Sequence, residues 1–159
     1  MLPEGVDIDG LARQLQEDGV AYSNQALALD LEAQAPVVEA LRPGHGIAVA
    51  DLYPDRPADV RDLATALQER TGLDTMIVQA PSRVSAVSES YDRAALESAQ
   101  RGLEPGLVQT DLLDRFYGSV DGFQVHWELI LVPIFCLLIA AGWAAWRAAR
   151  VTRGAAGPA

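Results

Sequence analysis

Residues 47–79 read IAVADLYPDRPADVRDLATALQERTGLDTMIVQ, and this stretch indicates the class of fold. Its two apolar runs, at 47–53 and 75–79, are each followed within two residues by a proline, which is typical of short buried strands. Between the runs, apolar residues recur with the spacing of one helix face: Val60, Leu63, Ala64 and Leu67. A strand–helix–strand unit of this kind predicts two parallel strands joined by a right-handed crossover.

The N-terminal side of this unit extends the same pattern. Residues 7–18 have the periodicity of an amphipathic helix, and Gly19 is a signal for its end. Residues 20–22 are apolar and could form an edge strand. A proline inside a helix costs about 3 kcal/mol, so we expect the next helix to begin near Ala35, with Pro36 in its first turn.

The C-terminal side predicts one more strand candidate and two helices. Residues 84–88 alternate apolar and small polar side chains, which fits either an edge strand beside 75–79 or a loop. Residues 90–100 predict a helix capped by Ser90. A last amphipathic helix is expected at 107–120, followed by a brief hinge at 118–124.

A second stretch decides how the chain is organised. Residues 129–146 read LILVPIFCLLIAAGWAAW and carry no formal charge, and a run of about 18 apolar residues is a transmembrane-helix candidate. Trp127 lies at one end of the run and Trp143 and Trp146 at the other, as is typical of side chains at the membrane–water interface. The run therefore predicts one membrane-spanning helix.

The fold class that follows is α/β: a small α/β/α sandwich and one C-terminal transmembrane helix. We expect the α/β domain at 1–125, the transmembrane helix at 126–148, and a short basic, disordered tail at 149–159.

Charge differs sharply between the two ends of the chain. Residues 1–128 carry 22 acidic residues and nine arginines, a net charge of −13, whereas the three residues Arg147, Arg150 and Arg153 follow the span. An acidic domain repels nucleic acid and attracts cations or a basic partner. Because arginines near a span tend to stay in the cytoplasm, we expect a cytoplasmic tail and an outward-facing domain. The alternative is a tail-anchored protein whose domain is cytoplasmic.

Candidate metal ligands follow the first strand of the central unit. Asp51 lies at the end of this strand and Asp55 in the loop after it, where ligands gather in open α/β sheets. Their oxygens suit Ca²⁺ or Mg²⁺, although such sites usually need six or more ligands, and a solvated turn is the alternative. His45 lies in a glycine-rich turn with no carboxylate partner close in sequence, and no phosphate-binding glycine motif is present.

The order of elements from residue 47 to Arg93 resembles the core of the TPM domain, a small α/β/α module that is often tethered to membranes. The matching parts are the strand at 47–52, the helix opening at 61–64, the strand and Pro-Ser at 76–82, and the helix entry at 90–93. The likeness is nearest to actinobacterial single-pass membrane proteins encoded beside peptidoglycan endopeptidases. Some TPM proteins are implicated in phosphatase activity or bind Ca²⁺ through loop acids, and Asp51 and Asp55 are the nearest counterparts by position.

Three functions are compatible with this sequence. The first, which we favour, is a non-enzymatic module held at the bilayer that binds or regulates a cell-envelope protein; the resemblance implies a role in cell-wall remodelling. The second is a metal-dependent phosphatase that uses Asp51 and Asp55. The third is a membrane-assembly factor whose span contacts other helices through small residues at 140–145.

Overall fold

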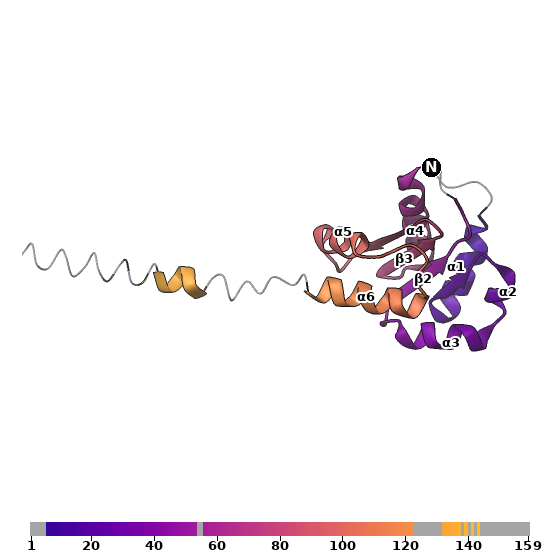
Figure 1. Cartoon of the computed structure of the whole chain (residues 1–159), viewed down its shortest axis with the longest axis horizontal. Coiled ribbons are helices and arrows are strands. Elements are labelled where there is room, and N and C mark those ends of the chain that lie inside the picture. The colour runs from indigo at the N-terminus through magenta and orange to yellow at the C-terminus, as the bar shows by residue number, and fades with distance from the viewer. Residues whose placement is uncertain are drawn as a thin grey trace, which may run out of the picture. The chain divides into compact units, whose positions relative to one another are not determined.

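The computed structural model describes residues 6–53, 56–122, 132–137, 139, 141 and 143. The chain divides into two compact units, residues 1–124 and residues 125–159 (Figure 1). We call the first unit the head domain.

The head domain is built on a four-stranded sheet. The strands are β1 (Val20–Tyr22), β2 (His45–Val49), β3 (Thr75–Ala80) and β4 (Arg83–Ser88), and they lie in the order β1-β2-β3-β4. The first three strands are parallel, and β4 is antiparallel to β3. The predicted parallel pair is confirmed, and so are the edge strand at 20–22 and the strand alternative at 84–88.

The first strand of the central unit is shifted from the prediction, because β2 begins at His45 and ends at Val49 rather than running from 47 to 53. Its end is set by local hydrogen bonds. The Asp51 N–H donates to Ser23 Oγ at 2.7 Å, and the Leu52 N–H donates to the carbonyl of Ala50 at 2.9 Å, so the chain turns away from the ladder there.

Helices cover both faces of the sheet, as Figure 1 shows. Helices α1 (Ile8–Asp18) and α4 (Pro57–Thr71) pack on one face, and α3 (Leu31–Ala40), α5 (Arg93–Arg101) and α6 (Gln109–Gly122) pack on the other. Strand side chains alternate between the two cores: in β3, Met76 and Val78 join the first and Ile77 joins the second, as the period of two in a strand requires. The α/β/α sandwich is therefore present.

The predicted start of the third helix was wrong. Helix α3 begins at Leu31, and the Asp30 carboxylate accepts the Ala33 N–H at 3.0 Å as its cap. Pro36 lies inside the helix, and because proline has no backbone N–H, the Glu32 carbonyl receives no helical hydrogen bond. Both residues are exposed, so water can bond to that carbonyl. A further short helix, α2 (Gln25–Ala28), precedes α3.

The ends of the last two helices also differ from the prediction. Helix α5 is preceded by Asp92 as its cap residue instead of Ser90, whose hydroxyl donates to Asp74 Oδ2 at 2.6 Å. Helix α6 continues through Gly118 to Gly122, so no hinge begins at 118. Its buried stripe, which includes Phe116 and Val120, holds the last turns on the sheet.

Glutamine side chains cover the two edges of the sheet. At β1, the Tyr22 N–H donates to Gln14 Oε1 at 2.9 Å, and Gln14 Nε2 donates to the Tyr22 carbonyl at 3.2 Å. At β4, Gln100 Nε2 donates to the Ala86 carbonyl at 3.3 Å. Exposed strand edges invite pairing with another chain, and these amide groups occupy backbone sites that such a strand would need.

The second unit contains the apolar run. Its described residues, 132–137, 139, 141 and 143, are helical, and large apolar side chains among them, such as Phe135 and Leu137, are exposed. Among the residues with a described placement, no helix has the length and apolarity needed to cross a membrane. The predicted span at 126–148 falls largely outside those residues, and the predicted tail at 149–159 falls wholly outside them.

Candidate functional site

One of the two predicted metal ligands lies in a cleft of the head domain. Asp51 is exposed at the carboxyl end of β2, and it lines a cleft of about 600 Å³ between α1 and α2. The location agrees with the rule that places ligands outside the carboxyl ends of parallel strands. Asp55, the second predicted ligand, lies outside the described residues.

The cleft has more acidic than basic side chains. Asp7, Glu17 and Asp51 line it together with a single arginine, Arg13. The Asp7 carboxylate is already engaged, because its Oδ1 accepts the Gly10 N–H at 2.9 Å as the cap of α1. Within the described part of the chain, no group of three histidine, cysteine, aspartate or glutamate residues is placed to hold a metal ion.

An exposed apolar surface adjoins this cleft through α2. It consists of Leu27, Leu29 and Leu31, whose exposed fractions are 43%, 75% and 71%. We call these three residues the leucine surface. Helix α2, which carries Gln25 and Ala28 of the cleft lining, buries none of its residues.

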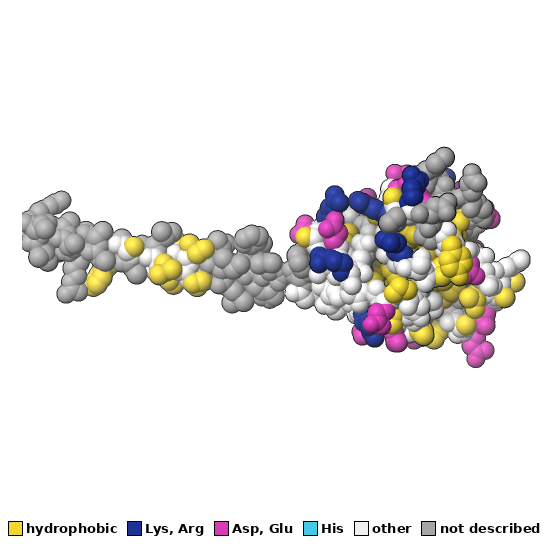
Figure 2. All heavy atoms as spheres, turned by 45° about the horizontal axis from the view of Figure 1, so that its top comes forward, with side chains coloured by type: hydrophobic (Ala, Val, Ile, Leu, Met, Phe, Trp, Pro, Cys, Tyr) yellow, Lys and Arg dark blue, Asp and Glu magenta, His cyan; other side chains and the backbone are white. Residues whose placement is uncertain are grey.

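The backbone beneath the leucine surface is nevertheless well fixed. Asn24 Oδ1 accepts the N–H groups of Ala26 and Leu27, and the buried Gln34 donates to the Leu27 carbonyl at 2.6 Å. Asp30 lies within this stretch and Glu32 directly follows it. At the α2 end of the head domain, Figure 2 shows hydrophobic and acidic side chains side by side. The surface is therefore a preformed apolar patch with an acidic border.

A polar cluster lies at the opposite end of the strands from Asp51, around the amino end of β2. His45 is buried there as the first residue of the strand, and its Nδ1 is 3.2 Å from the hydroxyl of Tyr117. Its Nε2 is 3.9 Å from Asp74 Oδ2, and Tyr91 packs edge-on against the ring. Burial lowers the pKa of His45, and the nearby Asp74 carboxylate only partly opposes this effect.

Arg42 joins this cluster to the last turn of α6. Its guanidinium donates to both carboxylate oxygens of Asp121, at 3.0 and 2.7 Å, and to the Tyr91 hydroxyl at 3.1 Å. It also lies over the Tyr117 ring, 4.2 Å from the centroid. The bonds from Arg42 lower the pKa of Asp121. These contacts lock the loop before β2 onto α6.

One comparison with known proteins gives a match, to a family model described as membrane protein Rv1476, over residues 1–158. The chain belongs to this family. The Rv1476 family is an actinobacterial family of membrane proteins, which agrees with the membrane placement expected from residues 129–146. No curated protein and no solved structure matches the chain. The TPM resemblance and the neighbouring genes therefore stay predictions.

Two features of this Rv1476-family chain were missed in the sequence. The partners that His45 and Arg42 have in α6 lie 72 to 79 residues away, and no local motif links them. The leucine surface belongs to residues 27–41, which have an apolar, helical pattern, and such a pattern alone does not tell an exposed leucine from a buried one. The acids at positions 30 and 32 were the available hint, because they interrupt the apolar run.

Proposed function

We propose that the head domain is a non-enzymatic docking module, held at the membrane, that binds a cell-envelope protein through the leucine surface. The observation that carries this proposal is the exposure of Leu29 and Leu31, 75% and 71%, on a backbone that hydrogen bonds hold in place. Burying an exposed leucine side chain is worth about 1.5–3 kcal/mol, so a partner that covers this surface gains substantial free energy.

The surroundings of the leucine surface favour a particular kind of partner. Asp30 and Glu32 border it, and Glu17 and Asp51 lie in the adjoining cleft. A segment with apolar side chains and neighbouring lysine or arginine residues complements this combination. Because Gln14 occupies the edge of β1, docking through side chains is favoured over the addition of a strand.

Membrane attachment favours binding between such a site and a partner in the same membrane. The apolar run at 129–146 and membership of a membrane-protein family support attachment through the C-terminal span. Tethering confines the head domain near the bilayer, so its effective concentration toward a membrane-bound partner is high. We propose that the head faces outward and that Arg147, Arg150 and Arg153 stay in the cytoplasm.

Orientation can be tested with a single engineered cysteine. Cys136 is the one cysteine of the chain, so Cys136→Ser gives a background without thiols. Glu89→Cys then places a thiol at an exposed head position. We expect a membrane-impermeant maleimide to label it in intact spheroplasts. Labelling that requires lysis contradicts the outward orientation and supports a tail-anchored protein.

Docking itself can be tested by cross-linking in cells and pull-down of the full-length chain. We expect the double variant Leu29→Ala/Leu31→Ala to lose a discrete partner that the wild type retains. Val108→Ala is the matched control, since Val108 is also apolar and exposed, by 61%, but lies elsewhere. A partner that both variants retain contradicts the proposal. If that partner is lost only when residues 129–146 become poly-leucine, the span makes the contact instead.

A further inference from the structure

Arginines gather on a part of the head domain remote in sequence from the leucine surface. Of the nine arginines in residues 1–128, four line two hollows that share Glu97 and Gln100: Arg61, Arg83, Arg93 and Arg101. In Figure 2, basic side chains lie over the α4 and α5 side of the head. This local excess of positive charge stands out because the same domain carries a net charge of −13.

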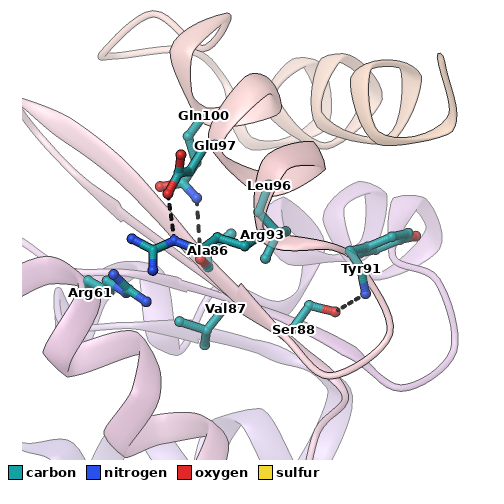
Figure 3. A pocket seen from close by; sticks show the side chains of 9 residues that line it. All are labelled: Arg61, Ala86, Val87, Ser88, Tyr91, Arg93, Leu96, Glu97 and Gln100. Carbon is teal, nitrogen blue, oxygen red and sulfur yellow. Dashed lines mark hydrogen bonds and ion pairs between the residues drawn. The ribbon is translucent and has the colours of Figure 1, made fainter. Parts of the chain in front are cut away.

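The first of these hollows, shown in Figure 3, measures about 200 Å³ and lies among α4, β4 and α5. Val87 and the buried Leu96 supply apolar lining, and Arg61 and Arg93 reach the hollow from different helices. A water molecule occupies about 30 Å³ in the liquid, so the volume of the hollow corresponds to about seven waters. That is the scale of one large side chain and is below the usual range for a nucleotide or other drug-sized ligand.

The charge in this hollow is only partly neutralised. Arg93 Nε donates to Glu97 Oε1 at 2.7 Å, a bond that lowers the pKa of Glu97. Arg61 makes no side-chain hydrogen bond or ion pair with any residue that the structure describes. In the lining itself one carboxylate, Glu97, faces two guanidinium groups, and Asp62, next to Arg61 in the chain, adds a second negative charge nearby. The guanidinium of Arg61 still has hydrogen-bond donors for a further anion.

We propose that this hollow binds an acidic polypeptide segment of a partner, with a glutamate, aspartate or C-terminal carboxylate on Arg61 and Arg93 and an apolar neighbour on Val87 and Leu96. The mixed lining favours a side chain over a bare inorganic anion. The domain's net charge of −13 opposes the long-range approach of any anion, and most of all of an extended anionic bilayer, whereas a single acidic side chain can enter the hollow and meet the arginines at short range. This site shares no residue with the leucine surface or its cleft, so it stands apart from the docking proposed above.

The test uses the full-length chain in phosphatidylcholine nanodiscs and a rhodamine-labelled peptide, GGLEFE, with a free carboxyl terminus. The matched neutral peptide is GGLQFQ with an amidated terminus. We expect fluorescence anisotropy to show saturable, salt-sensitive binding of the acidic peptide, and little binding of the neutral one. Loss of one charge-assisted contact weakens binding by about tenfold or more, so Arg61→Gln should do so.

Arg115→Gln is the matched control, because Arg115 is an exposed arginine of α6 that lies outside both hollows. It should leave peptide affinity unchanged, and all variants should keep the wild-type circular dichroism spectrum. Equal binding of the two peptides, or equal effects of Arg61→Gln and Arg115→Gln, overturns the proposal. So does displacement of the peptide by an equal concentration of inorganic phosphate. A lipid ligand is tested with fragment 1–124, which is a compact unit with its own cores. If this fragment sediments together with phosphatidylglycerol vesicles, and Arg61→Gln abolishes that, the ligand is a lipid and the proposal is overturned.

Discussion

The guanidinium of Arg42 and the carboxylate of Asp121 form a two-pronged ion pair across 79 residues of sequence, with N–O distances of 3.0 and 2.7 Å. The pair is partly exposed, with side-chain exposures of 38% and 52%. Such pairs are individually weak, but Arg42 also bonds to Tyr91 and stacks on Tyr117. The arginine thereby fastens the final turn of α6, from which the chain continues toward its apolar run.

The first prediction concerns this fastening. Arg42→Ala should lower the free energy of unfolding of fragment 1–124 by about 1–2 kcal/mol, since it removes a bidentate pair, a hydrogen bond and a cation–π contact. Urea unfolding followed by far-UV circular dichroism measures the change. Arg115→Ala is the control, because its exposed pair with Glu104 spans 4.0 Å and should contribute less than about 0.5 kcal/mol. Equal losses in the two variants would show that the contacts of Arg42 add nothing beyond a surface pair.

A second prediction follows from the buried imidazole of His45. Burial lowers the pKa of His45 below its ordinary value of about 6.5, so the unfolded chain takes up a proton at a higher pH than the folded chain does. The free energy of unfolding should therefore fall as pH decreases below about 6.5, and level off once folded His45 is protonated too.

Fragment 1–124 isolates this effect, because His45 is its one histidine. The pKa values of Asp74 and Asp121 are also lowered, by hydrogen bonds from Ser90 and Arg42, but the stability that they contribute is lost only below about pH 4. The measurement is the urea midpoint between pH 7.5 and pH 5. It should decrease in the wild type and stay flat in His45→Gln. A wild-type midpoint that rises on acidification would mean that His45 is charged in the folded state.

The third prediction concerns the side chain of Gln14, which covers the β1 edge of the sheet. Gln14→Ala leaves the N–H and carbonyl of Tyr22 without their side-chain partner, at a loss of about 1–2 kcal/mol in unfolding free energy. The uncovered edge should also promote self-association that increases with concentration. Sedimentation velocity of fragment 1–124 at several concentrations measures it. Gln16→Ala, which removes one bond to the Arg70 carbonyl away from the sheet, should stay monomeric. Monomeric behaviour of both variants would refute the protective role of Gln14.

The fourth prediction separates docking from metal-dependent catalysis. Asp51 is exposed, the neighbouring Asp7 carboxylate caps α1, and oxygen sites for Ca²⁺ or Mg²⁺ usually need at least six ligands. We therefore expect calorimetry of the full-length chain with either ion to show no saturable heat. The comparison is the double variant Asp51→Asn/Asp55→Asn. A saturable heat in the wild type that this variant loses would favour the phosphatase hypothesis.

Much of the head fold could be predicted because its determinants are local. Strands β2 and β3 are buried on both faces, so they appear as continuous apolar runs, and the helix between them has a regular apolar stripe. The end of α1 at Gly19 was also predicted, and Gly19 adopts a φ of 84° that favours glycine. The sequence offers both Asp7 and Asp9 as the cap of α1, and the structure uses Asp7.

The remaining features depend on contacts that the sequence does not display. Ser90 has the residue type of a helix cap, but Asp74, 16 residues earlier, takes its hydroxyl. Pro36 was expected near a helix start, yet the Asp30 cap and solvent exposure allow the helix to begin five residues before it. The candidate site was predicted in part: Asp51 lies at the expected strand end, whereas the leucine surface required knowledge of which apolar side chains remain uncovered.

Docking through the leucine surface is tested most directly by placing a photo-reactive diazirine amino acid at position 29 of the full-length chain in its own membranes. The comparison position is Glu69, an exposed residue of α4. We expect irradiation to give one discrete protein adduct from position 29, none from position 69, and loss of the adduct when Glu32→Arg reverses the charge beside the surface. No adduct from position 29, or the same adduct from both positions, would contradict the account.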